Sequence, residues 1–325
     1  MILLRLSGGL GNQMFEYALY IALKARGKTV KIDDVSDYMA ADRRSVQLNI
    51  FDAPYERASR EEIIRYTDAS MAFRDRVRRK LTGRKSLAYR ETEMAYDPSV
   101  FRRDPVYLEG YFQSERYFAD VKDEVRRRFR FRFDQQERQD ARNGSGIWQS
   151  GPGTLQDGPG SSQGHPGILP NGPGQALPEY CRSCLEQIRL GQSVAVHVRR
   201  GDYLDPKHGG IYEGICTREY YEEAMGRIRE RWPDARFFLF SNDPDWTRRN
   251  LGGEGRILVE GGSEETGYLD LYLMSQCRHA VIANSSFSWW GAWLIENPQK
   301  MVIAPSRWMN GRDCRDIYTE DMIRI

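Results

Sequence analysis

The 325-residue sequence has no long apolar run, and no stretch approaches the ~20 consecutive apolar residues that a membrane-spanning helix needs. Its first six residues enter a Gly-rich turn at once and show neither a charged leader nor a cleavage site. The five cysteines have no regular spacing, and Cys181 and Cys184 form a lone Cys-x-x-Cys pair, weak support for metal or redox chemistry. We therefore expect a cytoplasmic protein.

Strong net charge is also missing, because the formal net charge is only +2. Residues 1–140 nevertheless carry 28 Lys or Arg against 23 Asp or Glu, and the excess gathers in residues 74–85 and 126–132. These clusters lack interleaved aromatic platforms, which argues against a nucleic-acid partner. They indicate a solvated helix face or a peripheral contact with the inner face of an anionic membrane.

Hydrophobic patterning divides the chain into two halves in which strands and helices alternate. The expected strands cover residues 2–6, 29–33, 106–111, 193–199, 236–240, 279–283 and 301–304. The expected helices cover a segment from about residue 13, residues 59–65, 71–81, 120–129, 179–190, 217–231 and 267–276, and a segment after residue 288. This alternation predicts α/β domains, the second with a parallel, doubly wound sheet.

A Gly/Pro-rich segment separates the two halves. Between residues 143 and 178, 16 of 36 residues are Gly or Pro. The segment therefore has too few apolar residues to form a core. We predict an N-terminal α/β domain over residues 1–142, a flexible insertion or linker over 143–178, and a C-terminal domain over 179–325.

The most informative stretch is residues 193–203, Ser-Val-Ala-Val-His-Val-Arg-Arg-Gly-Asp-Tyr. Its valines predict a buried strand that delivers His197, Arg199, Arg200 and Asp202 to its carboxyl end, where open α/β sheets bind ligands. A guanidinium fits phosphate bidentately, so a diphosphate is one interpretation. A salt-bridged strand end is the other.

Two strand-to-helix turns could receive an anion at a helix N-terminus. Residues 7–13, Ser-Gly-Gly-Leu-Gly-Asn-Gln, contain Gly11 and Asn12 but fit neither a Walker loop nor Gly-x-Gly-x-x-Gly, and a tight turn that needs positive φ explains them equally. Residues 284–288 contain Ser285, Ser286 and Phe287 and lead into three tryptophans, which we expect in the core. Asp270 could accept from a guanine or merely favour a helix N-terminus.

Three stretches together carry a resemblance: residues 8–15, residues 197–203 and residues 270–293. In order and over nearly the whole chain outside 143–178, they resemble the α-1,2-fucosyltransferases of glycosyltransferase family 11, in its bacterial form. The resemblance implies a GT-B-like fold with two Rossmann-like α/β domains, of which the C-terminal one binds the donor. It also implies GDP-β-L-fucose as donor, inversion at the anomeric carbon, the 2-hydroxyl of a terminal β-galactose as acceptor, and no metal or other cofactor.

The same resemblance implies roles for single residues. Arg199 would contact the β-phosphate of the donor, His197 the nucleoside side and Asp270 the guanine. Ser285, Ser286 and Phe287 would form the phosphate-binding turn, and Gly11 and Asn12 would face donor and acceptor. The acceptor would be an oligosaccharide or lipid-linked glycan, as in the synthesis of a surface polysaccharide or O-antigen.

The expected chemistry needs fixed positive charge, because the leaving diphosphate gains negative charge that Arg199 and Arg200 would stabilise. The acceptor hydroxyl must also lose a proton. Asp202 is the nearest motif carboxylate, but it could equally orient an arginine; Glu213 lies in the following loop. The transition state could also be dissociative enough to demand little of a base.

Two other functions compete. Asp243-Pro244-Asp245 spells the Asp-x-Asp with which metal-dependent GT-A enzymes hold a divalent cation. Pro244 fits better as the first residue of a helix capped by Asp243. A non-catalytic carbohydrate-binding or scaffold protein would be the second alternative.

Overall fold

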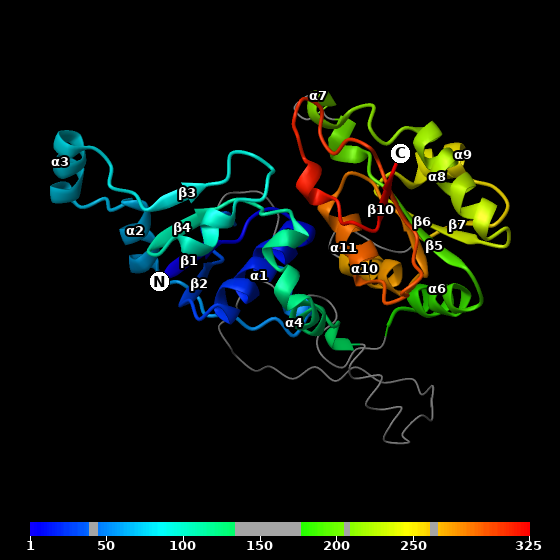
Figure 1. Cartoon of the computed structure of the whole chain (residues 1–325), viewed down its shortest axis with the longest axis horizontal. Helices are drawn as coiled ribbons and strands as arrows, with labels where there is room; N and C mark the ends of the chain where they lie inside the picture. Colours follow the sequence, from blue (N-terminus) through cyan, green and yellow to red (C-terminus); the bar gives the residue numbers. More distant parts are fainter. Residues whose placement is uncertain (39–44, 134–176, 205–208, 261–265) are drawn as a thin grey trace, which may run out of the picture.

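The computed structural model describes residues 1–38, 45–133, 177–204, 209–260 and 266–325. Two parallel sheets follow one another along the chain, each with helices packed on it (Figure 1). This is the predicted GT-B-like architecture of two Rossmann-like α/β units. The predicted linker lies outside the described residues except for its last two positions, of which Leu177 is buried in the core.

The N-terminal sheet has the strand order β2-β1-β4-β3, and all its strand pairs are parallel. Its strands are β1 (Ile2–Arg5), β2 (Val30–Asp33), β3 (Ala88–Arg90) and β4 (Val106–Glu109). Its α-helices are α1 (Leu10–Ala25), α2 (Arg60–Thr67), α3 (Phe73–Thr82) and α4 (Lys122–Arg128). Short 3-10 helices cover Leu48–Ile50, Pro98–Arg102, Glu115–Tyr117 and Ala119–Val121.

The C-terminal sheet has the strand order β10-β9-β8-β5-β6-β7 and is also fully parallel. Its strands are β5 (Ser193–Val198), β6 (Arg236–Ser241), β7 (Arg256–Leu258), β8 (His279–Val281), β9 (Val302–Ala304) and β10 (Met322–Arg324). Its α-helices are α6 (Glu179–Arg189), α7 (Gly209–Tyr212), α8 (Arg218–Arg231), α9 (Pro244–Leu251), α10 (Gly267–Gln276) and α11 (Ser286–Leu294). Short 3-10 helices, η5 and η6, cover Gly201–Leu204 and Arg315–Ile317.

Local sequence signals account for several helix starts. Thr217 caps α8 by accepting the N–H of Tyr220, and Asp243 caps α9 by accepting the N–H of Trp246, with Pro244 as the first helical residue. The predicted start of α1 near residue 13 is wrong. Gly9 is the N-cap and Leu10 is already buried, so the apolar face begins one turn earlier.

Three short strands were absent from the sequence prediction. Strands β3, β7 and β10 have three residues each and no fully buried residue, so they lack the hydrophobic alternation of a strand. Strand β10 therefore corrects the prediction of a polar tail after residue 304. It pairs with β9 at the edge of the sheet.

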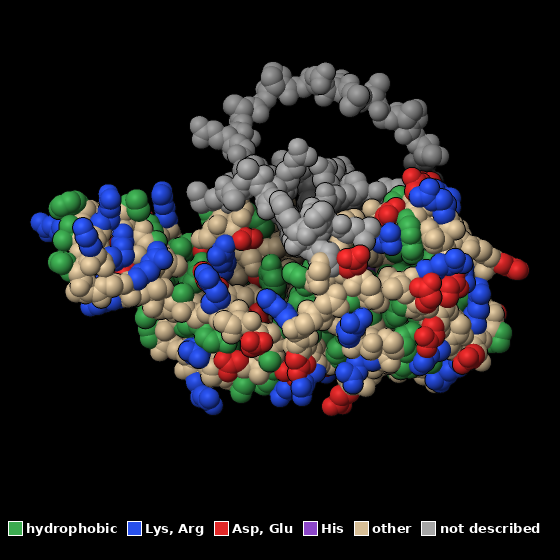
Figure 2. All heavy atoms as spheres, turned by 90° about the horizontal axis from the view of Figure 1, so that it is seen from above, with side chains coloured by type: hydrophobic (Ala, Val, Ile, Leu, Met, Phe, Trp, Pro, Cys, Tyr) green, Lys and Arg blue, Asp and Glu red, His purple; other side chains and the backbone are tan. Residues whose placement is uncertain are grey.

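Helix α3 stands apart from the rest of the N-terminal half and carries no buried residue (Figure 1). Lysine, arginine and hydrophobic side chains lie side by side at that end of the molecule (Figure 2). No helix among the described residues is long and apolar enough to cross a membrane.

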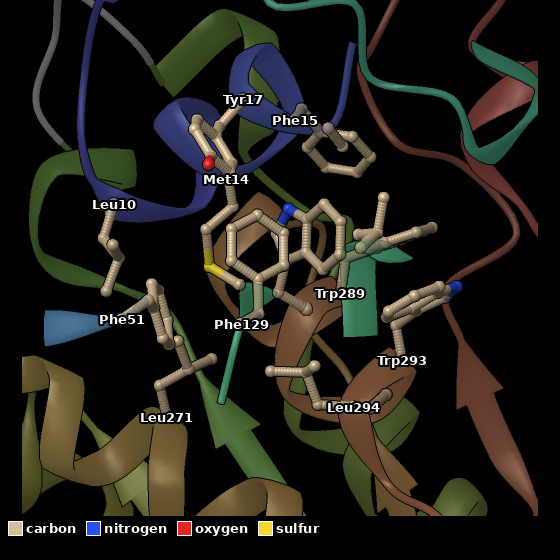
Figure 3. Close-up of a cluster of buried hydrophobic side chains, with 14 of the residues drawn as sticks. Leu10, Met14, Phe15, Tyr17, Phe51, Phe129, Leu271, Trp289, Trp293 and Leu294 are labelled. Carbon is tan, nitrogen blue, oxygen red and sulfur yellow. The ribbon is translucent and has the colours of Figure 1, made fainter. Parts of the chain in front are cut away.

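One hydrophobic core joins the two halves through α1 and α11. Phe15 of α1 lies 4.6 Å from Trp289 of α11 between ring centroids (Figure 3). Trp289 and Trp290 are fully buried and Trp293 is nearly so, as predicted for the core. Each indole N–H is satisfied, by Ile317 O, Gly11 O and Glu115 Oε1 respectively.

Candidate active site

The strand orders of the two sheets place the candidate residues at equivalent positions. In the C-terminal sheet the chain runs outward from β5 through β6 to β7, then returns to β8 on the other side of β5. In the N-terminal sheet β1 lies in the same way between β2 and β4. Such a reversal is a topological switch point, where loops diverge at the carboxyl ends of neighbouring strands and leave a crevice for a ligand.

The Gly-rich loop after β1 is held from behind by polar side chains. Gly8 has a φ of +68°; its N–H donates to Asp37 Oδ2 and its carbonyl accepts from Gln13 Nε2. The carboxylate of Glu16 accepts from both the N–H and the hydroxyl of Ser7, at 2.9 and 2.6 Å. Burial raises the pKa of Glu16 well above its usual value. These contacts fix the loop in one shape.

Gly11 forms the closest approach between the two halves. A Cβ atom at this position would lie 2.5 Å from the backbone nitrogen of Phe287 and 2.6 Å from the carbonyl carbon of Ser286. The first turns of α1 and α11 are therefore packed backbone to backbone, and only glycine leaves the space. Gly11 was predicted to face donor and acceptor; the contact that the structure shows for it is this packing.

Asn12 connects both switch points. Its Oδ1 accepts a hydrogen bond from Gln113 Nε2, which follows β4, at 2.8 Å and another from Ser286 Oγ, which follows β8, at 2.7 Å. Two donors on one oxygen fix the orientation of the amide, so that its NH₂ group lies beside Gly8. The predicted residues Asn12 and Ser286 thus meet directly, although 273 positions lie between them.

Gln113 was missed by the sequence analysis. The turn that delivers it is unusual, because Phe112 is fully buried at a φ of +50°, a conformation that costs a bulky residue of order 1–3 kcal/mol. The carboxylate of Glu91 holds this turn by accepting the N–H groups of Tyr111 and Phe112. The only sequence signal for Gln113 was that it follows a predicted strand. The sequence could not show that this strand, β4, pairs with β1 and so brings Gln113 beside Asn12.

His197 and Arg199 lie at the carboxyl end of β5. His197 is buried, its ring centroid is 5.5 Å from that of Phe287, and its Nδ1 atom has no hydrogen-bond partner in the described part of the chain. Burial and the neighbouring Arg199 charge lower the pKa of His197 to about 3, so the imidazole is neutral. An unpaired buried nitrogen is costly and fits a site whose partner is a ligand.

Arg200 has different surroundings from Arg199. Its Nε atom lies 3.3 Å from Asp243 Oδ2, and its guanidinium lies 3.9 Å from the ring centroid of Trp246. The other oxygen of Asp243 caps α9, and Asp245 pairs with Arg248. Asp243 and Asp245 are thus engaged with the start of a helix, which counts against the Asp-x-Asp metal site considered above.

Asp270 lies in the first turn of α10, and its carboxylate has no hydrogen-bond partner among the described residues. Burial raises its pKa to about 7. Like the Nδ1 atom of His197, it is a buried polar group for which the described residues supply no hydrogen-bond partner.

Ser285 is the N-cap of α11, but its side chain makes no capping hydrogen bond. The first N–H groups of a helix have no partner within the helix, so this turn keeps donors for an anion. Ser285 and Ser286 follow β8, beside the end of β5 that carries Arg199. Arg199 and the N-terminal turn of α11 therefore follow neighbouring strands at one switch point.

The two candidate bases are less well defined. Asp202 lies in η5, and its side chain is outside the described part of the structure. Glu213 is exposed, and its carbonyl accepts from Asn310 Nδ2. Its carboxylate makes no hydrogen bond or ion pair with the arginines or the serine turn among the described residues.

Comparison with known proteins identifies this arrangement. Residues 177–323, which include the arginine segment 197–203 and the serine turn 284–288, match the family described as Glycosyl transferase family 11. The C-terminal half of the chain therefore carries the match to this family.

Two curated proteins show how far the likeness extends beyond this segment. The chain is 27% identical to the Alpha-1,2-colitosyltransferase of Escherichia coli, over all of this chain and 98% of that protein. It is 35% identical to the Galactoside alpha-(1,2)-fucosyltransferase 1 of Aotus azarae, over 36% of this chain and 35% of that protein. A solved NodZ alpha-1,6-fucosyltransferase soaked with GDP-fucose is 13% identical, with a TM-score of 0.43 over 90% of this chain and 92% of that one, too distant a likeness to bear on function.

Proposed function

We propose that this family 11 glycosyltransferase transfers L-fucose from GDP-β-L-fucose to the 2-hydroxyl of a terminal β-galactose, with inversion at the anomeric carbon. One observation carries the proposal. Arg199 and the N-terminus of α11 leave neighbouring strands, β5 and β8, at the switch point of a sheet with nucleotide-binding strand order. When a sugar nucleotide binds at such a site, its negatively charged diphosphate would lie beside Arg199 and the N-terminus of α11.

The nucleoside end of the donor would bind to His197 and Asp270. A carboxylate at Asp270 can accept from both the ring N–H and the amino group of guanine, a pair of donors that adenine and uracil do not offer. The free Nδ1 atom of His197 can pair with a hydroxyl or phosphate oxygen. Two groups that have no hydrogen-bond partner among the described residues would thus be satisfied when the donor binds.

Bond cleavage would be assisted mainly by Arg199. As the bond between the anomeric carbon and the β-phosphate oxygen breaks, negative charge develops on that phosphate. The Arg199 guanidinium and the first N–H groups of α11 oppose it in a fixed geometry, each charge-assisted hydrogen bond contributing about 1.5–3 kcal/mol. We propose that no metal ion is needed, so a chelator should leave the rate unchanged.

The acceptor oxygen forms the new bond on the opposite face of the sugar and loses its proton. We propose Asp202 as the base, with Glu213 as the second candidate. Asp202→Asn should then lose transfer while GDP affinity stays unchanged, because the amide keeps the shape but cannot take a proton. Weaker GDP binding by about 1–3 kcal/mol would instead mean that Asp202 orients an arginine, and Glu213 would be tested next.

The α-1,2 linkage is supported by the names of two relatives, which both specify it. They differ in the transferred sugar, colitose in one name and fucose in the other. The full-length relative therefore makes nucleotide-activated colitose the second donor to test. A β-galactoside in an oligosaccharide or lipid-linked surface glycan is the acceptor we propose.

The decisive experiment incubates the protein with GDP-fucose and a panel of β-galactosides, including a 2-deoxygalactoside, and reads the products by mass and by NMR linkage analysis. We expect fucose on O2 of galactose and no product from the 2-deoxy acceptor. Preference for the colitose donor would replace the sugar but keep the linkage. Donor hydrolysis without acceptor separates an enzyme from a non-catalytic carbohydrate-binding protein.

A further inference from the structure

Helix α3 is an exposed helix with a large apolar surface that nothing in the described structure covers. None of its ten residues is buried. Phe73 and Leu81 are each 79% exposed, Met71 just before the helix is 78% exposed, and Val77 is 40% exposed. Exposed side chains of this size gathered in one place mark a contact surface.

The apolar residues lie on one stripe. At about 100° per residue, Phe73, Val77 and Leu81 fall within about 80° of one another around the helix. Arg74 and Lys80 lie about 60° to either side of the centre of this stripe, and Asp75 lies on the far side. The helix therefore has an apolar stripe with cations along both flanks.

The cations near the stripe are available, whereas those behind it hold the helix in place. Asp68 pairs with Arg78 and Arg79 and also accepts the N–H of Lys85, which closes the base of the arm formed by residues 68–85. No ion pair holds Arg74, Arg76, Lys80, Arg84 or Lys85 within the described part of the chain. Ion pairs thus tie the base of the arm together, while Arg74 and Lys80 flank the stripe without an ion pair among the described residues.

We propose that α3 docks this protein on an anionic membrane surface, with Phe73, Val77 and Leu81 in the boundary between headgroups and acyl chains. Cations flanking a short apolar stripe are the pattern of an interfacial helix, because the phosphates lie just above the apolar boundary. At ten residues the helix is about 15 Å long and can lie on a bilayer but not cross it. The contact is peripheral and reversible.

Charge also decides between occupants of this face. A second copy of the chain packed stripe to stripe would bring Arg74 and Lys80 of both copies together, which is unfavourable. An anionic lipid surface pairs with all of them at once. This inference stands whatever sugar the enzyme transfers, because α3 contributes no residue to the candidate active site.

The test is flotation of the full chain with vesicles of phosphatidylcholine alone or mixed with phosphatidylglycerol. We expect binding to the mixed vesicles only, and its loss at high salt as the surface charge is screened. Phe73→Ser with Leu81→Ser should lower the bound fraction at least about tenfold, and Arg74→Glu with Lys80→Glu should do the same. Transfer to a water-soluble acceptor should stay unchanged in both variants.

Matched controls lie on the C-terminal half. Leu190→Ser removes an apolar side chain that is 76% exposed, and Arg218→Glu with Arg249→Glu reverses two exposed charges; both should bind mixed vesicles like the wild type. Equal binding to uncharged vesicles, or equal loss in control and α3 variants, would overturn the proposal. So would a concentration-dependent dimer, seen by sedimentation without lipid, that the Phe73/Leu81 variant abolishes.

Discussion

Arg199 and Arg200 are adjacent in sequence, but their side chains have different partners. Arg200 pairs with Asp243 and stacks on Trp246. Arg199 follows β5, and the neighbouring strand β8 leads into Ser285. A pair of arginines predicts an anion site but cannot reveal which member faces it, since Asp243 comes from β6 and meets Arg200 only in the folded chain. The chemistry assigns the larger role to Arg199.

Substitution of Arg199 tests that assignment. Arg199→Ala should lower kcat about 10²–10³-fold, the usual loss when one fixed donor to a developing charge is removed. Arg199→Lys should also fail, because an ammonium cannot replace the bidentate fork. Arg200→Ala is the neighbouring control and should lose less, because its guanidinium holds Asp243 and Trp246 at the start of α9. Equal losses in the steady-state rates of the two alanine variants would contradict this division.

Asp270 makes donor binding dependent on pH. Its pKa is about 7, and the guanine contact needs the carboxylate, so GDP affinity should fall up to tenfold per pH unit below about pH 7 and level off above it. Calorimetric titration with GDP across pH 5–9 measures this affinity, and we expect the slope to change at about pH 7. Asp270→Asn should bind GDP weakly at every pH; a variant that keeps the wild-type slope would exclude Asp270 as its source.

The same group gives a second readout in the free protein. Because its folded pKa is raised above the unfolded value, its protonated form contributes stability that is fully present at low pH and is lost as the pH rises through about 7. Asp270→Asn removes the buried charge and should raise the free energy of unfolding at pH 8 by about 1–4 kcal/mol. Denaturant unfolding at pH 5 and pH 8 provides the comparison.

Among elements, α1 and α11 matter most, because their first turns touch. Gly11→Ala would place a methyl group against the backbone of Ser286 and Phe287, which cannot move as a side-chain end can. We expect a loss of about 1–3 kcal/mol in stability and a large fall in transfer. Gly9→Ala is the matched control, since a Cβ there meets nothing within 4 Å. Thermal unfolding measures the stability of both variants, and initial rates measure their transfer activity. If Gly11→Ala changes neither, the two helices can move apart without cost.

Elements with strong local signals were predictable. Ser193–Val198 is buried throughout, and Thr217 and Asp243 cap their helices as the sequence indicated. Strands β7 and β10 were not, because a three-residue edge strand derives its structure from a neighbour rather than from its own pattern. The positive-φ turn at Phe112 could not be predicted either, because it depends on Glu91, which follows the neighbouring strand β3.

At the scale of the whole molecule, the two sheets were predictable but their junction was not. Alternating patterns predict two α/β units, yet nothing local indicates that Asn12 accepts from Gln113 and Ser286 together. That contact depends on strand order in both sheets. The sequence motifs thus located the candidate site residues, and tertiary structure decided which of them meet.

The shared core predicts how the molecule unfolds. Phe15, Trp289 and Trp290 from the two halves lie within one cluster, so neither half keeps a complete core when the other unfolds. We expect a single transition in scanning calorimetry, with calorimetric and van't Hoff enthalpies in agreement. Two resolved transitions would mean that the halves are independent despite this cluster.

The contact between Gly11 and the first turn of α11 also limits how such a protein can change over generations. Residue 11 and residues 286–287 are far apart in the gene, yet a larger side chain at the first is tolerated only if the backbone at the second retreats. Recombination that joins the front half of one relative to the back half of another would therefore separate two surfaces shaped for each other. Because the two segments are in contact, a substitution in one must be matched by a compatible change in the other.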